Sequence, residues 1–219
     1  PIDFKGVYLT EQEFDKIIAD FDDRGLAVVR KDGAFGVIKH TGDMLADCVY
    51  TTYLDHSPVR LLRTESSDWV VVVRDRSKDG YTMYEWALDE PIIVNAEDGY
   101  GIISPRTSAV VADFIYDSVT EYIPNSVYGL QRDTLKYLYA DDKLSVPFEE
   151  VVPSQGNIYY VVKENGKYGV MSHTSRMLAD CIYAKYLYRG PAALLRAESS
   201  TDWVVVVKDA SDEGASVYT

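Results

Sequence analysis

The sequence predicts an all-β protein built as a tandem array of small hairpin repeats. Three observations support this prediction: a long internal duplication, a shorter period inside it, and an abundance of tyrosine. Tyrosine occurs 18 times in 219 residues, against six phenylalanines and three tryptophans. Tyrosine suits half-buried strand positions, where the ring packs and the hydroxyl reaches water or a backbone group.

The duplication repeats a long stretch of the chain. The segment MLADCVY at Met44–Tyr50 returns 133 residues later as MLADCIY at Met177–Tyr183. Further along, LLRTESSDWVVVVRD returns as LLRAESSTDWVVVVKD. A residue that is present in every copy of a repeat usually builds the repeat, so these shared residues are interpreted as structural.

A shorter period lies inside the duplication. Each unit has an apolar stretch, a polar tight turn, and a second apolar stretch that opens with an aromatic residue. Asp-Gly and Asn-Gly turns supply the positive φ angles that two-residue hairpins require. The opening aromatics are Phe35, Trp69, Tyr100, Tyr128, Tyr168 and Trp203. They predict six units of about 34 residues in one repeat domain over 1–219. The predicted units are 22–57, 58–89, 90–121, 122–155, 156–190 and 191–219.

A glycine follows the aromatic residue in four of the units, whereas both tryptophan units carry valine there. Glycine inside a strand marks a bulge or the close approach of a bulky neighbour. We expect that neighbour to be an aromatic ring of an adjacent unit, and we expect the tryptophan units to lack the approach. The four glycines are Gly36, Gly101, Gly129 and Gly169.

Three units carry a further apolar stretch that contains an aspartate and ends in a tyrosine. Catalytic carboxylates act as differentiated pairs in one pocket, whereas these recur 66 and 67 residues apart. We therefore interpret them as turn or strand-end residues that bond backbone N–H groups. The pairs are Asp47 with Tyr50, Asp113 with Tyr116, and Asp180 with Tyr183.

The N-terminal segment predicts a short amphipathic helix over 11–21. Thr10 and Glu13 form a capping-box pattern, and four apolar residues follow at helical spacing. These are Phe14, Ile17, Ile18 and Phe21. The expected role of the helix is to cover the exposed edge of the first unit, because terminal units of an array need a cap.

The unit is similar to the bacterial WG-containing repeat, also called the KWG repeat. The best match runs from Phe21 to Tyr50 and reads GLAVVRKDGAFGVIKHTGDMLADCVY from Gly25. The next runs from Tyr159 to Tyr183 and contains NGKYG, and a third, from Pro91 to Asp117, contains EDGYGIIS. None of the units has tryptophan followed by glycine, which departs from the family pattern. The resemblance implies an all-β array for binding or assembly and brings no catalytic residue. Unit length favours an open, superhelical array over a propeller-like closure.

The net charge of −13 argues against nucleic acid and anionic membranes as partners. No apolar run reaches the roughly 20 residues of a membrane span, so no membrane insertion is predicted. Cys48 and Cys181 occupy equivalent positions and are interpreted as buried thiols. The absence of a disulfide framework slightly favours the cytoplasm, but the chain begins at Pro1, so the compartment stays open and export remains an alternative.

The sequence predicts no cofactor and no firm metal site. His40 and His173 each precede a cysteine by eight residues, which gives fewer ligands per copy than zinc needs. The acidic loops at 75–79 and 209–213 do not match the calcium-loop template, so weak calcium binding remains only an alternative.

These observations favour a non-catalytic binding or scaffolding module that offers tyrosine-lined grooves to a protein or peptide. Two alternatives stay open. One is an enzyme or small-ligand site in the atypical unit, in the segment from Arg132 to Asp142. The other is a fragment of a longer repeat protein whose activity lies elsewhere.

Overall fold

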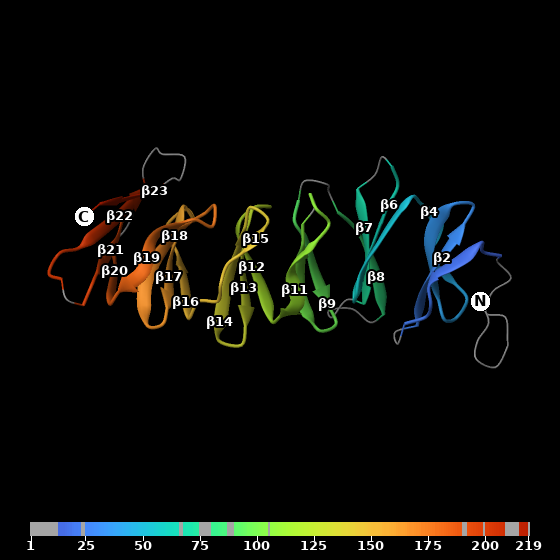
Figure 1. Ribbon diagram of the computed structural model, residues 1–219, viewed down its shortest axis with the longest axis horizontal. Coiled ribbons are helices and arrows are strands. Elements are labelled where there is room, and N and C mark those ends of the chain that lie inside the picture. Colours follow the sequence, from blue (N-terminus) through green and yellow to red (C-terminus); the bar gives the residue numbers. More distant parts are fainter. Residues whose placement is uncertain are drawn as a thin grey trace. The chain divides into compact units, whose positions relative to one another are not determined.

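The computed structural model describes residues 13–22, 25–65, 68–74, 80–86, 90–104, 106–189, 192–198, 200–208 and 215–218. Within these ranges the protein is all-β, as predicted: 23 strands form six small antiparallel sheets (Figure 1). No helix occurs in the described residues, and hence none that could cross a membrane. The chain divides into two compact units, Pro1–Leu88 and Asp89–Thr219.

The first unit contains two four-stranded sheets, each with its strands in chain order. Sheet one consists of β1 (Lys16–Ala19), β2 (Leu26–Lys31), β3 (Ala34–Lys39) and β4 (Met44–Tyr50). Sheet two consists of β5 (Thr52–His56), β6 (Val59–Arg63), β7 (Trp69–Arg74) and β8 (Tyr81–Trp86).

The second unit contains four sheets, of which the first has three strands and the others four. Sheet three consists of β9 (Ile92–Ala96), β10 (Gly99–Ile103) and β11 (Val110–Tyr116). Sheet four consists of β12 (Ser118–Ile123), β13 (Val127–Arg132), β14 (Leu135–Ala140) and β15 (Lys143–Leu144). Sheet five consists of β16 (Glu150–Pro153), β17 (Tyr159–Glu164), β18 (Lys167–Ser172) and β19 (Met177–Tyr183). Sheet six consists of β20 (Lys185–Arg189), β21 (Ala192–Arg196), β22 (Val204–Lys208) and β23 (Ala215–Tyr218).

Tight turns join the central hairpin strands of sheets one and five. Asp32 and Gly33, between β2 and β3, have φ angles of 51° and 82°. Asn165 and Gly166, between β17 and β18, have φ angles of 51° and 74°. Two consecutive positive φ angles are what the hairpin turn that matches strand twist requires, and Asn, Asp and Gly reach them at the least cost.

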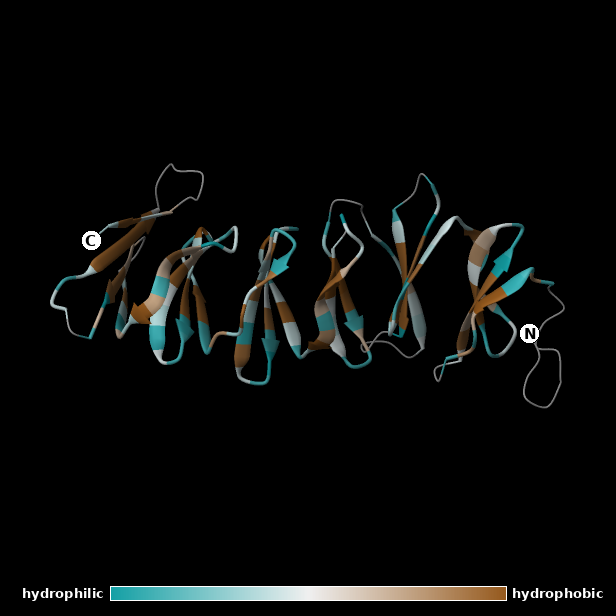
Figure 2. Ribbon diagram, in the orientation of Figure 1, coloured by the Kyte–Doolittle hydropathy of each residue, from teal (hydrophilic) through white to brown (hydrophobic). Residues whose placement is uncertain are grey.

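The core lies between consecutive sheets inside each unit. In the first unit, Val28 and Val37 of sheet one share an apolar cluster with Leu62 of sheet two. In the second unit, apolar clusters join sheet three to sheet four, sheet four to sheet five, and sheet five to sheet six. Figure 2 shows the matching pattern, with hydrophobic residues concentrated in the strands and hydrophilic ones in the turns. Each small sheet is therefore stabilised mainly by face-to-face packing on its neighbour.

The predicted N-terminal helix is wrong for the described part of that segment; residues 11 and 12 lie outside the described residues. Residues Lys16–Ala19 form β1, which pairs antiparallel with β2. The apolar residues do not form one stripe: Phe14 and Phe21 pack on one face of the sheet, whereas Ile18 packs on the other. A strand distributes side chains to both faces and hydrogen-bonds to the edge of β2, which a helix would leave open.

The repeating element of the structure is a small sheet, not a two-stranded hairpin. The predicted division into six hairpin units of about 34 residues does not follow from these sheets, because most of them add a strand on each side of the central hairpin. The proposed unit boundaries and the open superhelical arrangement stay predictions.

Candidate functional site

Three edge strands, β4, β11 and β19, carry the same bulge. In sheet one, Val37 pairs with Ala46 and Phe35 pairs with Tyr50, so residues 47–49 of β4 lie opposite the single residue Gly36. The registers of β11 and β19 shift in the same way, opposite Gly101 and Gly169. Extra residues on one strand bend that strand and turn its side chains toward new directions.

Only glycine fits opposite each bulge, because the bulged strand comes very close to the glycine backbone. A Cβ atom on Gly36 would lie 2.8 Å from the carbonyl oxygen of Ala46 and 2.7 Å from Sγ of Cys48. On Gly101 it would lie 2.3 Å from the ring of Phe114. The expectation of a ring from an adjacent unit is therefore wrong, because the neighbour is the bulged strand of the same sheet.

Two other units complete this comparison. Gly129 faces the ring of Tyr122 on β12, again within its own sheet. In sheet two, Val70 replaces the glycine, and β7 pairs with β8 without a register shift. A valine fits there because no bulge approaches it.

Each bulge presents an aspartate and, two residues later, an exposed aliphatic side chain. The aliphatic residues are Val49, Ile115 and Ile182, which are 55%, 38% and 60% exposed. The aspartates Asp47, Asp113 and Asp180 are also exposed. Between each pair stands Cys48, Phe114 or Cys181, which contacts the facing glycine. Of these three bulge residues, only the middle one packs against the neighbouring strand.

The three aspartates were expected to bond backbone N–H groups. None of them accepts a hydrogen bond from a described residue, although the strands around them are described throughout. Each bulge therefore carries a carboxylate and an apolar side chain that have no evident partner within the described part of the chain.

Most of the motif aromatics pack inside the protein, but Tyr168 and Trp203 also line a surface pocket of about 430 Å³ beside Tyr186. Phe35, Tyr100, Tyr168 and Trp203 are half-buried, whereas Trp69 and Tyr128 are buried. The strand-end tyrosines are similar: Tyr50 and Tyr183 are half-buried and Tyr116 is buried. The ring of Phe35 lies 5.8 Å from that of Tyr53 on the next sheet, and Tyr168 repeats this contact with Tyr186 at 5.6 Å. Such aromatic pairs bind consecutive sheets together.

Basic side chains cover four of these rings. Arg63 lies 4.6 Å from the ring centre of Trp69, and the equivalent Arg196 lies 4.8 Å from that of Trp203. Arg30 and Lys163 take the same place over Phe35 and Tyr168, each at 5.5 Å. These cation–π contacts occupy ring faces that a partner would otherwise use.

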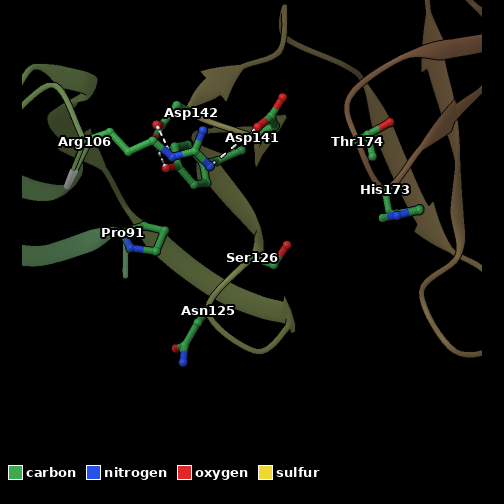
Figure 3. A pocket seen from close by; sticks show the side chains of 9 residues that line it. Pro91, Arg106, Asn125, Ser126, Asp141, Asp142, His173 and Thr174 are labelled. Atoms are coloured by element: carbon green, nitrogen blue, oxygen red, sulfur yellow. Dashed lines mark hydrogen bonds and ion pairs between the residues drawn. The ribbon is translucent and has the colours of Figure 1, made fainter. Parts of the chain in front are cut away.

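One polar pocket lies within the second unit (Figure 3). Its volume is about 380 Å³. It is lined by Pro91, Arg106, Asn125, Ser126, Tyr139, Asp141, Asp142, His173 and Thr174. Sheets four and five and the residues flanking sheet three contribute these side chains, so the pocket depends on the packing of consecutive sheets.

An ion-pair cluster occupies one wall of this pocket. Nε of Arg106 lies 3.4 Å from Oδ2 of Asp142, and its Nη2 lies 3.7 Å from Oδ1 of Asp141. The hydroxyl of Tyr139 donates a hydrogen bond of 2.8 Å to Oδ1 of Asp142. Burial, followed by this hydrogen bond, raises the pKa of Tyr139, which keeps the phenol protonated as a donor.

The pocket coincides in part with the atypical segment from Arg132 to Asp142. Tyr139, Asp141 and Asp142 line it, whereas Arg132 is exposed elsewhere. His173 was interpreted from the sequence as structural, but it lines this pocket, and its Nδ1 lies 3.3 Å from the carbonyl oxygen of Ile158. Only the tertiary packing brings a turn of sheet five to this place, and no sequence motif signalled it.

The histidine and cysteine positions form no metal site. His40 lies exposed in a turn, and Cys48 and Cys181 are half-buried free thiols whose pKa is raised by burial. No group of three or more His, Cys, Asp or Glu side chains among the described residues could hold a metal ion. The acidic loops 75–79 and 209–213 lie outside the described residues.

Comparison with family models finds no match, and comparison with curated proteins finds none either. Among solved structures, Hsv2 of Kluyveromyces lactis is similar with a TM-score of 0.26 and 11% identity, over 87% of this chain and 73% of that one. The WD40 β-propeller domain of Doa1 is similar with a TM-score of 0.23 and 12% identity, over 95% and 84%. A 6-phosphogluconolactonase-type protein of Bacteroides fragilis gives 0.27 and 9%, over 93% and 82%. Likenesses at this level carry no inference about activity.

Proposed function

We propose that the protein is a non-catalytic binding module, similar in its repeat to the WG-containing family, and that its bulged edge strands contact a protein or peptide partner. The observation that carries the proposal is the exposed Asp-x-aliphatic pair that recurs on β4, β11 and β19. Singly exposed apolar side chains are ordinary, so what supports an interaction surface is their recurrence at one structural position beside an exposed carboxylate.

The charge of the chain indicates the chemistry of the partner. The net charge is −13, and each exposed aliphatic residue lies two positions from an aspartate without a described partner. A partner segment that combines apolar and basic side chains satisfies both groups at once. Its basic residues would accelerate association, and its apolar residues would slow dissociation.

A synthetic peptide of alternating lysine and valine, titrated by calorimetry, tests this proposal. Replacing Val49, Ile115 and Ile182 together by serine is expected to weaken binding by at least about tenfold. Each serine buries less apolar area against the peptide than the aliphatic side chain that it replaces. Replacing Asp47, Asp113 and Asp180 by asparagine is expected to weaken it most at low salt.

Val146→Ser is the matched control. This valine is 57% exposed, as much as the bulge residues, but it lies in the link between β15 and β16. Binding that falls equally in Val146→Ser, or that is unchanged in the triple serine variant, would contradict the proposal.

The polar pocket supports a second candidate, a site for a small uncharged or zwitterionic ligand. The Arg106 guanidinium faces two carboxylates, which leaves one excess negative charge that the ammonium group of a zwitterion can pair with, and Asn125, Ser126 and Thr174 add neutral polar groups to the lining. Titration with monosaccharides and free amino acids, followed through the Arg106 side-chain NMR signal, tests it. A saturable shift that Asp142→Asn removes supports this site, and an unmoved signal for every compound rejects it.

A further inference from the structure

Among the described residues, sheet three has no equivalent of the first strand of the other sheets. In sheets one, two, four, five and six, a strand pairs with the outer edge of the central hairpin: β1, β5, β12, β16 and β20. In sheet three the hairpin strand β9 is the edge, and among the described residues no strand pairs with its outer side.

The chain between β8 and β9 is shorter than the chain that contains β5. Between Tyr50 and Val59 the chain has eight residues, which contain the whole of β5 and its turn. Between Trp86, where β8 ends, and Ile92, where β9 begins, it has five, and one of these is Pro91. Pro91 directly precedes β9 and has no backbone N–H to donate to a ladder.

The register of β9 defines which backbone groups face the open edge. Ala96 pairs with Gly99 across a two-residue turn, so Ala96, Val94 and Ile92 are the residues that hydrogen-bond to β10. The N–H and C=O groups of Ile93 and Asn95 therefore point away from β10, and no described residue bonds to them. The Oδ1 atom of Asn95 is also shielded from solvent, and no described residue donates a hydrogen bond to it.

We propose that β9 accepts an extended strand from a partner protein, which completes sheet three as its first strand. A row of outward N–H and C=O groups is a template for strand addition, and main-chain hydrogen bonds supply much of the affinity in that mode. Alternate side chains of the added strand would lie beside Ile93, which contacts the apolar cluster between sheets three and four.

The charge around β9 selects a basic strand. Glu90 precedes the strand, the net charge of the chain is −13, and no lysine or arginine occurs among the described residues 90–104. The segment AKYLYR at 184–189 has the required character, because it contains β20, the first strand of sheet six, and carries two basic residues. A capped peptide of this sequence is therefore a suitable probe, with AEYLYE as its acidic counterpart.

Hydrogen exchange followed by NMR on the intact protein gives the direct test. Addition of AKYLYR is expected to slow exchange of the Ile93 and Asn95 amides by at least about tenfold, because both acquire acceptors. Asn95→Pro removes one outward N–H without touching the ladder to β10, and is expected to weaken peptide binding at least about tenfold. Asn95→Ala keeps the N–H and is expected to bind as the unchanged protein does.

The possible results separate this proposal from its rivals. Protection at other edges, equal binding by Asn95→Pro and Asn95→Ala, or equal binding of AEYLYE overturns it. A dimer of the protein alone that Asn95→Pro dissolves also overturns it, because the occupant is then a second copy. If Asn95→Pro fails to fold, the exchange measurement on the unchanged protein still decides. The inference concerns β9 and not the bulges, so it stands or falls apart from the serine variants.

Discussion

The glycine after the motif aromatic shows how a single residue is determined by the strand beside it. Gly36, Gly101 and Gly169 each face three residues of a bulged neighbour, and backbone oxygens lie 2.7 to 2.9 Å from where a Cβ would stand. A backbone atom cannot rotate aside as a side chain can. The bulge on one strand therefore requires the glycine on the neighbouring strand.

Gly36→Ala is expected to lower the free energy of unfolding by about 1–3 kcal/mol, the usual cost of forcing a methyl group into a packed site. Urea denaturation at neutral pH measures it. Gly166→Asn is the control, because nothing lies within 4 Å of that position and asparagine tolerates its φ of +74°. An unchanged midpoint for Gly36→Ala would contradict the close approach.

The sequence predicted that these glycines mark a bulge or a close contact, but not which atom makes the contact. The glycine is a local signal, whereas the register shift that brings Ala46 and Cys48 onto Gly36 depends on pairing with β4. The same limit applies to the pocket, where His173 joins Tyr139 and Asp142 through packing of sheets four and five. The exposure of Val49 on β4 could not be predicted from its apolar character, because the apolar residues of the neighbouring strands β2 and β3 are mostly buried.

At the scale of elements, β1 shows why a helical spacing of apolar residues can mislead. Phe14, Ile18 and Phe21 have helix-like spacing, yet Phe14 and Phe21 pack on one face of sheet one and Ile18 on the other. The segment forms a strand and not a helix because the edge of β2 offers backbone N–H and C=O groups, to which a strand can hydrogen-bond. Tertiary pairing outweighs a capping-box pattern that contributes about 1 kcal/mol.

A buried ion pair links sheet one to sheet two. Nη2 of Arg60 on β6 lies 2.5 Å from Oδ2 of Asp22, which follows β1, and the two side chains are 8% and 21% exposed. Asp22 also accepts a hydrogen bond of 2.9 Å from the Leu26 amide at the start of β2. One carboxylate thus links the entry of β2 to the neighbouring sheet across 38 residues of sequence.

Arg60→Met is expected to destabilise the protein by about 2–4 kcal/mol, because it leaves the Asp22 carboxylate without its nearest cation in a largely buried place. Thermal and urea unfolding measure the loss. In the double variant with Asp22→Asn the two losses are expected to be less than additive, which a double-mutant cycle detects. Full additivity would show that the two side chains do not interact.

At the scale of the whole molecule, tyrosine makes folding sensitive to alkali. Burial is the leading cause that raises the pKa of Tyr53, Tyr116 and Tyr159 to about 12, from an ordinary value of 10.0. Folding thus keeps protonated several phenols that the unfolded chain would ionise at lower pH. Their contribution is complete below pH 10 and declines as pH rises, because only the unfolded state loses protons there.

We expect the free energy of unfolding to fall between about pH 10 and pH 12, by roughly 1 kcal/mol for each buried tyrosine at pH 11. Urea denaturation at a series of pH values tests this. Absorbance at the phenolate wavelength should show a fraction of the 18 tyrosines ionising only together with unfolding. A stability that stays level up to pH 12 would contradict the assignment.

The division into two compact units predicts that damage stays local. Gly36→Ala lies in the unit Pro1–Leu88, and Gly169→Ala, its equivalent, lies in Asp89–Thr219. Each variant is expected to accelerate amide exchange throughout its own unit and much less in the other, because stability in stacked arrays comes from nearest neighbours. Equal acceleration in both units would indicate a single cooperative block.

The turn between β17 and β18 also bears on how the protein ages. Asn-Gly is the dipeptide most prone to deamidation, a reaction that begins when the glycine nitrogen attacks the asparagine side chain. Here the Gly166 N–H donates a hydrogen bond of 2.9 Å to Oε1 of Glu149, and the turn holds Asn165 in a fixed conformation. Folding should therefore slow the deamidation of Asn165. The gain of one mass unit at Asn165 during storage then reports how much time the chain has spent unfolded.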